Sequence, residues 1–166
     1  KEVVRRVEAY RSLNKPVIIY GESGSGKELV ARHLIRSEKE PFVVFDCSAF
    51  NEELFFADML GNTTGAYTDA TDRQGVFREA DGGILVLDYV DELPLLLQGG
   101  LLRVIESGEV KPLGGVTSTK VNVRIVALAK RNLKEAVEEE TFRKDLYHRL
   151  NVFTIQVPPL RERIAD

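Results

Sequence analysis

The sequence contains little cysteine and little histidine, and these shortages exclude two classes of site. Cys47 is the only cysteine among 166 residues, so the chain cannot form an internal disulfide, and this usage is typical of a reducing compartment. His33 and His148 lack the close spacing of metal ligands. We therefore treat both histidines as ordinary helix residues and expect neither a disulfide framework nor a histidine metal site.

Long apolar runs are missing as well. No segment reaches the roughly 20 residues of a membrane-spanning helix, and no signal peptide leads the chain. We expect a cytoplasmic protein without membrane contact. The net charge of −3 lacks the basic excess of a nucleic-acid surface. What is present, 43% hydrophobic and 30% charged residues without repeats, is typical of one globular domain with a sizeable core.

Short apolar segments alternate with helical patterns along the chain. The predicted strands are residues 17–20, 42–45, 84–87, 123–129 and 152–157. The predicted helices are residues 1–12, a helix ending near residue 37, and residues 52–60, 75–80, 94–106, 132–140 and 141–150. This alternation predicts an α/β fold whose parallel sheet is covered by helices on both faces. Right-handed crossovers then bring the strand ends, and any ligand, to one edge.

Three segments depart from this simple alternation. Residues 61–75 are rich in Gly, Thr and Asp and predict a loop that is too long for mere connection. Gly99 and Gly100 stand in the middle of helix 94–106, where each costs about 1 kcal/mol relative to alanine. We expect that helix to be weak or bent there. Residues 110–121 predict a hairpin.

A glycine-rich segment follows the first predicted strand. Residues 21–27 fit the pattern G-x-x-x-x-G-K, and strand, glycine loop and helix in this order are the context of a P-loop. The glycines let N–H groups point at phosphate oxygens, the helix N-terminus adds a favourable dipole, and Lys27 supplies a positive charge. The predicted phosphate-binding residues are Gly21, Glu22, Ser23, Gly24, Ser25, Gly26, Lys27, Glu28 and Leu29. Glu28 stands where Ser or Thr usually helps to hold magnesium.

A carboxylate ends the third predicted strand. Asp88 follows four apolar residues, which predicts an aspartate that holds Mg²⁺ directly or through water. ATPases of this build commonly have a Glu next, which orients or deprotonates the attacking water. Here the next residue is Tyr89, and a phenol is a poor base at neutral pH. Asp91 and Glu92 are close in sequence, but either would need a different loop path to reach the water.

These motifs resemble those of the central AAA+ domain of bacterial enhancer-binding proteins, which activate sigma-54 RNA polymerase. The matching segments are residues 21–31, 82–88, 92–94, 142–153 and 158–163. The resemblance makes Glu28 a family trait. It implies a three-layer αβα P-loop NTPase of AAA+ type with a five-stranded parallel sheet, which binds ATP or ADP with Mg²⁺ and assembles into a ring. It also implies that Arg143 and Arg149 are arginine fingers directed at the nucleotide of a neighbouring subunit.

The resemblance also concerns parts that lie outside these residues. The chain begins within a helical pattern and stops at Asp166, so we expect residues 1–166 to be one α/β subdomain of a longer protein. The helical lid of AAA+ proteins should follow Arg163 and is missing here. A receiver domain of a two-component system, or a ligand-sensing domain, and a helix-turn-helix that binds DNA are expected elsewhere in the protein.

The chain departs from this family at the output loop and at catalysis. The loop that contacts sigma-54 has the family motif Gly-Ala-Phe-Thr-Gly-Ala, and the corresponding residues here are Gly65, Ala66, Tyr67, Thr68, Asp69 and Ala70. Asp69 adds a charge and a Cβ at a tip that favours positive φ. Ala129 and Lys130 replace a Thr-Asn pair that senses the γ-phosphate. Asp46 replaces an Asn that couples the nucleotide to the missing Glu.

We therefore expect a domain that binds nucleotide, hydrolyses ATP weakly or not at all, and contacts sigma-54 weakly. Two alternatives remain open. In the first, Asp91 or Glu92 replaces the missing Glu, and the domain is an active ATPase that remodels sigma-54 RNA polymerase. In the second, the domain has kept only its fold and acts as a non-hydrolysing assembly or inhibitory module.

Overall fold

The computed structural model describes residues 1–48 and 51–163. Within them, five parallel strands form one sheet in the order β2-β3-β6-β1-β7. The strands are β1 (Val17–Tyr20), β2 (Phe42–Asp46), β3 (Ile84–Asp88), β6 (Arg124–Ala129) and β7 (Phe153–Gln156). The predicted five-stranded parallel sheet is therefore confirmed.

Successive residues of each central strand face opposite sides of the sheet, and both sides are apolar. Ile18 belongs to one buried cluster, whereas Val17 and Ile19 belong to the other. β3 and β6 alternate in the same way, as the period of two in a strand requires. The continuous apolar runs of the sequence are thus the mark of a sheet that is buried on both faces.

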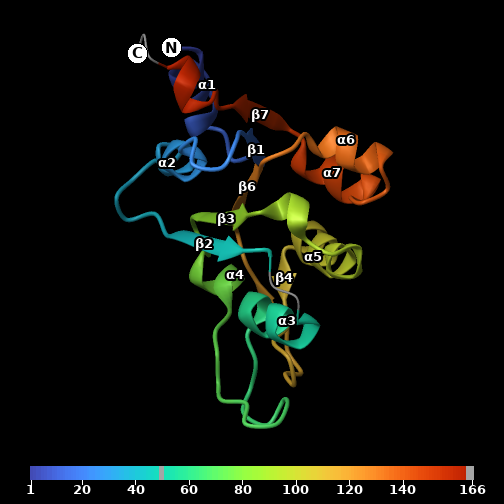
Figure 1. The fold of residues 1–166 in the computed structure, drawn as a ribbon. Coiled ribbons are helices and arrows are strands. Elements are labelled where there is room, and N and C mark those ends of the chain that lie inside the picture. Colours follow the sequence, from blue (N-terminus) through green and yellow to red (C-terminus); the bar gives the residue numbers. More distant parts are fainter. Residues whose placement is uncertain (49–50, 164–166) are drawn as a thin grey trace.

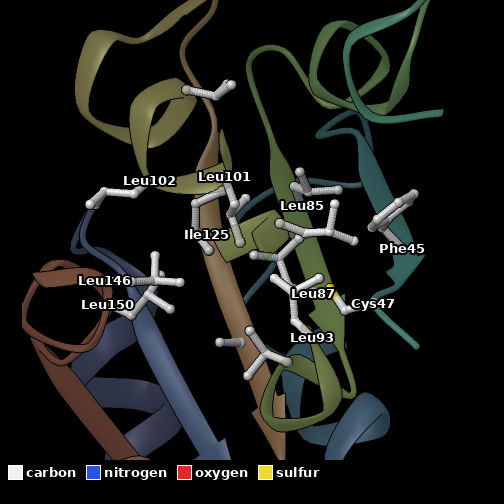
Figure 2. Packing of buried hydrophobic residues seen from close by; sticks show 14 of the residues in the cluster. Phe45, Cys47, Leu85, Leu87, Leu93, Leu101, Leu102, Ile125, Leu146 and Leu150 are labelled. Atoms are coloured by element: carbon white, nitrogen blue, oxygen red, sulfur yellow. The ribbon is translucent and has the colours of Figure 1, made fainter. Parts of the chain in front are cut away.

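Helices cover both faces and complete three layers (Figure 1). α1 (Glu2–Arg11) and α2 (Lys27–Arg32) pack on the face of Val17 and Ile19. The opposite face carries α3 (Glu52–Leu60), α4 (Val76–Glu79), α5 (Leu95–Ser107), α6 (Leu133–Glu138) and α7 (Lys144–Leu150). Figure 2 shows leucines of α5 and α7 in the cluster that includes Ile125 of β6. The predicted αβα architecture is confirmed.

The helix after the glycine loop is shorter than predicted. α2 ends at Arg32 instead of near residue 37, and the N–H groups of residues 33–35 each donate to the carbonyl three residues earlier. Such tighter turns commonly end a helix. The carbonyl of Ile35 accepts a hydrogen bond from Nε of Arg11 in α1 at 2.7 Å. A contact with a distant helix, which local sequence does not reveal, therefore holds the chain after α2.

The glycines do not interrupt the helix predicted over residues 94–106, which was expected to be weak or bent there. α5 is one uninterrupted helix of 13 residues. A Cβ on Gly100 would lie 2.3 Å from Cζ of Phe56 in α3, which is too close for two carbon atoms. Gly100 therefore allows the close packing of α3 against α5, and this packing compensates for the low helix propensity of glycine.

Two irregular segments lie beyond the sheet, at the bottom of Figure 1. The predicted hairpin is confirmed as the antiparallel pair β4 (Glu109–Val110) and β5 (Thr119–Lys120). The predicted loop 61–75 is also confirmed. None of the helices in residues 1–48 and 51–163 has the length and apolar composition that a membrane crossing demands.

Replacing Gly100 by alanine tests the packing of α3 against α5. Gly100→Ala should destabilise the fold by about 1–3 kcal/mol, the usual cost of overpacking a core, although alanine favours a helix by about 1 kcal/mol. Gly99→Ala is the matched control, because its Cβ would meet only the end of the Arg143 side chain, 3.1 Å away. Urea unfolding should show unchanged or higher stability for Gly99→Ala. A similar gain in both variants would contradict the packing argument.

Candidate functional site

The P-loop begins where β1 ends. The N–H of Gly21 donates to the carbonyl of Ala129 in β6 at 3.2 Å, and the chain then turns at Gly24 (φ 73°) and Gly26 (φ 88°) before α2 starts at Lys27. Glycine adopts such φ values without strain. Among the described residues, the N–H groups of Gly24, Gly26 and Lys27 find no acceptor. The loop therefore presents free N–H groups, the arrangement that binds phosphate oxygens.

Lys27 points back into this loop. Its Nζ donates to the carbonyl of Gly21 at 2.7 Å and to that of Glu22 at 2.8 Å. Burial lowers the pKa of the Lys27 ammonium, and nearby Asp88 opposes this effect. Phosphate oxygens could accept hydrogen bonds from the same ammonium. Such bonds join two charged groups and are stronger than bonds to neutral carbonyls.

Ser25 is buried, and its Oγ has no hydrogen-bond partner within the described part of the chain. A Cβ on Gly21 would lie 2.6 Å from this Oγ and 2.9 Å from the carbonyl of Val157, just after β7. The loop is thus packed closely against the end of a neighbouring strand. A buried hydroxyl without a partner is costly, and such groups are characteristic of sites that complete their hydrogen bonds with a ligand.

One pocket of 270 Å³ connects the P-loop with the ends of β3 and β6. Its walls are formed by Ser23, Gly24, Gly26, Lys27, Glu28, Asp88, Tyr89, Asp91, Leu128, Ala129 and Lys130. These segments meet because β1, β3 and β6 are parallel and β6 lies between the other two. The structure therefore brings together the P-loop, Asp88 and Lys130. Four of the predicted P-loop residues lie outside the walls, namely Gly21, Glu22, Ser25 and Leu29.

Asp88 occupies the end of β3 inside this pocket. Its Oδ1 accepts the N–H of Tyr89 at 2.9 Å. Burial raises the pKa of the Asp88 carboxyl, against the effects of this hydrogen bond and of Lys27. Tyr89 has a φ of 55°, a left-handed conformation that is unusual for an aromatic residue. This conformation turns the chain from β3 into the 3₁₀ helix η1 (Val90–Glu92) and leaves Tyr89 partly exposed.

Lys130 forms the wall on the side of β6. Its Nζ donates to Oε1 of Glu92 at 2.9 Å and lies 5.6 Å from the ring centroid of Tyr89. The hydrogen bond with Glu92 raises the pKa of the Lys130 ammonium. The backbone N–H of Lys130 donates to Oδ2 of Asp91 at 3.3 Å. Two departures from the family pattern, Tyr89 and Lys130, thus contact each other.

The two acids after Tyr89 differ in their surroundings. Glu92 forms its ion pair with Lys130 and is not part of the pocket wall. Asp91 lines the pocket, and its Oδ1 is buried without a hydrogen-bond partner among the described residues. Of the two acids, only Asp91 therefore reaches the pocket.

Two arginines that the sequence did not reveal hold the P-loop from outside. Arg161 in the 3₁₀ helix η2 (Leu160–Glu162) donates to both carboxylate oxygens of Glu22 at 2.8 and 2.9 Å, and these hydrogen bonds lower the pKa of the Glu22 carboxyl. Nη2 of Arg163 donates to the carbonyl of Ser25 at 2.7 Å. Their only signal in the sequence was the match to the late family block, which gave neither residue a role.

Arg143 and Arg149 lie away from the pocket, and neither of these two described residues forms part of its wall. Arg143 is the N-cap of α7 and Arg149 lies in its last turn, and both are exposed. The helix begins after Arg143, so the two side chains lie at opposite ends of α7. The guanidinium of Arg143 donates to the two carboxylate oxygens of Asp145 at 3.0 and 2.8 Å.

Asp46 also lies outside the pocket, although it pairs with Asp88 in the register of β2 and β3. Its Oδ1 accepts hydrogen bonds from the N–H and the hydroxyl of Ser48 at 2.8 and 2.6 Å. Asp46 instead lines a second cavity, of 690 Å³, with residues of α3 and of the loop before α4. In this conformation Asp46 does not reach the pocket that contains Asp88 and Tyr89.

The predicted contact loop, residues 65–70, lies at the tip of loop 61–75, which extends away from the sheet (Figure 1). At the neck of this loop, Asn62 and Arg73 exchange backbone hydrogen bonds of 3.1 and 2.8 Å. Asp69 has a φ of 61°, the positive value expected where the family has glycine. Asp is among the few residues with a Cβ that visit this conformation.

The sheet order, the P-loop and the aspartate at the end of β3 define an α/β P-loop NTPase of the AAA+ class. The sequence comparison then places the chain within that class. The sigma-54 interaction domain family matches residues 1–156. The chain belongs to this family, which confirms the resemblance inferred from its motifs.

Named relatives agree with this assignment. The chain is 44% identical to the nitric oxide reductase transcription regulator NorR2 of Cupriavidus necator, over 99% of the chain and 32% of that protein. It is 47% identical to the DNA-binding transcriptional regulator NtrC of Escherichia coli, over 90% of the chain and 33% of that protein. The chain thus spans about a third of the length of the curated relatives it matches.

A solved structure shows the same fold. NtrX from Brucella abortus in complex with ATP aligns with a TM-score of 0.87 at 35% identity, covering 99% of this chain and 38% of that one. The ADP complex of NtrX aligns with a TM-score of 0.85 at 34% identity, covering 95% and 35%.

Proposed function

We propose that this chain is the ATP-binding AAA+ domain of a sigma-54-dependent transcription regulator, and that it hydrolyses ATP weakly. The observation that carries the proposal is the single pocket in which the P-loop, Asp88 and Lys130 meet. The ATP and ADP complexes of NtrX, a protein of the same fold, support a nucleotide in this position.

The residues around the pocket suit a triphosphate. The free N–H groups of the P-loop would bind phosphate oxygens, and Lys27 would exchange its two carbonyl partners for the β- and γ-phosphates. Lys130 would add a second cation where the family has a neutral residue. Its partner Glu92 is about as exposed as Lys130 itself, and exposed ion pairs are weak. A phosphate can therefore replace Glu92 at Lys130.

Asp88 fits the Mg²⁺ ion that accompanies such nucleotides. One of its oxygens accepts the Tyr89 N–H, and the other, which has no hydrogen-bond partner among the described residues, could bind a metal or its water. No group of three His, Cys, Asp or Glu side chains able to hold a metal occurs in the described residues. Magnesium would therefore depend on Asp88 together with phosphates and water, which is its usual mode of binding in nucleotide sites. Bound there, it would neutralise charge on the phosphate oxygens.

Two lysine variants test the binding of nucleotide. Lys27→Met should weaken both ATP and ADP by about 10- to 100-fold, the equivalent of one hydrogen bond to a charged group at ~1.5–3 kcal/mol. Lys130→Met should weaken ATP more than ADP, because the family resemblance places residue 130 at the γ-phosphate. Calorimetry with Mg²⁺ measures both affinities, and exposed Lys39→Met is the control. Equal losses of ATP and ADP affinity in Lys130→Met would refute the role of Lys130.

Weak hydrolysis follows from the residue after Asp88. A phenol neither accepts a proton readily at neutral pH nor carries the negative charge of a carboxylate. The ring of Tyr89 also lies beside the Lys130 ammonium, so this part of the pocket is more positive than a carboxylate would make it. Such a site favours holding the γ-phosphate over activating a water molecule.

Asp91 supports a second candidate function, an active ATPase that remodels sigma-54 RNA polymerase. It reaches the pocket and has one oxygen without a hydrogen-bond partner among the described residues. That oxygen is buried, however, and the other accepts the N–H of Lys130. Asp91 would have to turn before it could receive a proton from water, so we place this candidate second.

Tyr89→Glu separates the two candidates. In the full-length protein this variant should raise ATP turnover by up to about 100-fold, the lower part of the range for a general base, whereas Tyr89→Phe should leave it unchanged. Turnover is measured by phosphate release in Tyr89→Glu, Tyr89→Phe and Asp91→Asn. High turnover in the unmodified protein that is lost in Asp91→Asn would establish the second candidate instead.

The proposed partners are a neighbouring copy and sigma-54 RNA polymerase. Arg143 and Arg149 are exposed and lie away from their own pocket, which supports a role toward the nucleotide of another subunit in a ring. The loop with residues 65–70 extends away from the sheet, which supports contact with a partner. Contact with DNA would belong to another domain of the protein.

Asp69 variants test the contact with sigma-54. Asp69→Gly should strengthen binding of purified sigma-54 to the ATP-bound full-length protein several-fold, because glycine removes both the charge and the cost of positive φ. Asp69→Asn removes the charge but keeps a side chain that tolerates this φ. Fluorescence anisotropy measures the affinities. Equal gains would identify the charge as the obstacle, and no gain in either variant would show that Asp69 does not limit the contact.

A further inference from the structure

Gln98 in α5 is completely buried and polar. Its side-chain amide makes three hydrogen bonds to the backbone of other segments. Nε2 donates to the carbonyl of Leu93 at 2.8 Å and to the carbonyl of Thr141 at 3.1 Å, and Oε1 accepts the N–H of Arg143 at 2.8 Å. An amide is costly to bury unless it is hydrogen-bonded, so this network admits only a narrow range of arrangements for the three segments.

The bonded segments belong to different parts of the function. Leu93 directly follows η1, which carries Asp91 of the pocket wall. Thr141 and Arg143 belong to the turn that enters α7. Gln98 therefore connects two segments. One is the chain at Leu93, just after the pocket, and the other is the backbone of Arg143, the arginine proposed to contact a second copy.

The side chain of Arg143 is held by the neighbours of this network. Its guanidinium is paired with Asp145, and its Nη1 would lie 3.1 Å from a Cβ placed on Gly99. The absence of a side chain at residue 99 thus leaves room for the guanidinium over α5. Gln98 fixes the backbone of Arg143, and the side chain lies over Gly99 with its guanidinium paired to Asp145.

Apolar packing alone would not fix Arg143 in this way. Leu101 of α5 and Leu146 of α7 belong to the same buried cluster (Figure 2), and apolar packing of this kind is not directional. Phe142 is buried beside the turn and anchors it, but an apolar side chain does not set the position of a neighbouring N–H to within a hydrogen-bond distance. The amide of Gln98 supplies that constraint.

We propose that Gln98 is a positioning residue that holds Arg143 in a fixed place relative to the chain's own nucleotide pocket. The proposal rests on the proposed function, in which Arg143 contacts nucleotide bound by a neighbouring copy. It adds that the placement of this arginine depends on one buried amide, which also binds the segment leaving the pocket.

A double-mutant cycle tests this role. The variants are Gln98→Met, which conserves volume, Arg143→Ala, and the two combined in the full-length protein. Sedimentation velocity measures ATP-dependent self-association, and calorimetry measures ATP affinity. Gln98→Met should weaken ATP-dependent self-association about tenfold when Arg143 is present, the order of coupling found between contacting residues. It should have no further effect in Arg143→Ala, and ATP affinity should change less than about twofold.

Gly99→Ala is a second test, because Gln98→Met could weaken self-association simply by unfolding the domain. Its extra methyl group favours the helix but displaces the Arg143 guanidinium. It should weaken self-association in the same Arg143-dependent way while urea unfolding shows no loss of stability.

The outcomes separate this proposal from the proposed function. Equal losses with and without Arg143 would show a purely structural role for Gln98 and overturn the proposal. The proposal would also be overturned if the protein binds ATP but self-associates equally strongly with and without ATP. Failure of the unmodified protein to bind ATP in calorimetry would overturn the proposed function itself.

Discussion

The close approach of three strand ends at Gly21 is the constraint on which the site depends. The N–H of Gly21 is bonded to the carbonyl of Ala129 at the end of β6, and no Cβ fits between Ser25 and the carbonyl of Val157 after β7. The P-loop therefore starts from a fixed point on the sheet. From that point, the register of the parallel strands places Asp88 and Lys130 at the same edge, and the two late arginines brace the loop from outside.

Beside this fixed loop, Lys130 connects two residues that follow β3. Its ammonium donates to Glu92 and lies over the ring of Tyr89, so residues 89, 92 and 130 form one arrangement. An aromatic ring attracts a cation at this distance. The pocket therefore combines the N–H groups and the lysine of the P-loop with an aromatic ring beside a second cation.

Features set by local pattern could be predicted from the sequence, whereas features set by distant contacts could not. The strands and the P-loop follow from apolar runs and glycine spacing. The chain after α2 is held by Arg11 of another helix, and the glycine in the middle of α5 is matched by the close fit of Phe56 against Gly100. Gln98 lies within a helical pattern, and nothing in that pattern shows that its partners are the backbone groups of Leu93, Thr141 and Arg143.

The neck of the predicted contact loop is built from close backbone contacts that do not involve Asp69. A Cβ on Gly75 would lie 2.3 Å from the N of Gly61, so the two ends of the loop are too close together for a side chain at residue 75. The hairpin segment adds hydrogen bonds between Leu113 and this neck, at 2.9 Å to Gly61 and 3.0 Å to Thr63. The neck is thus held on both sides, by Gly75 of its own loop and by Leu113 of the hairpin segment. Asp69 lies outside the neck, so its replacement changes the surface of the tip and removes none of the neck's backbone hydrogen bonds.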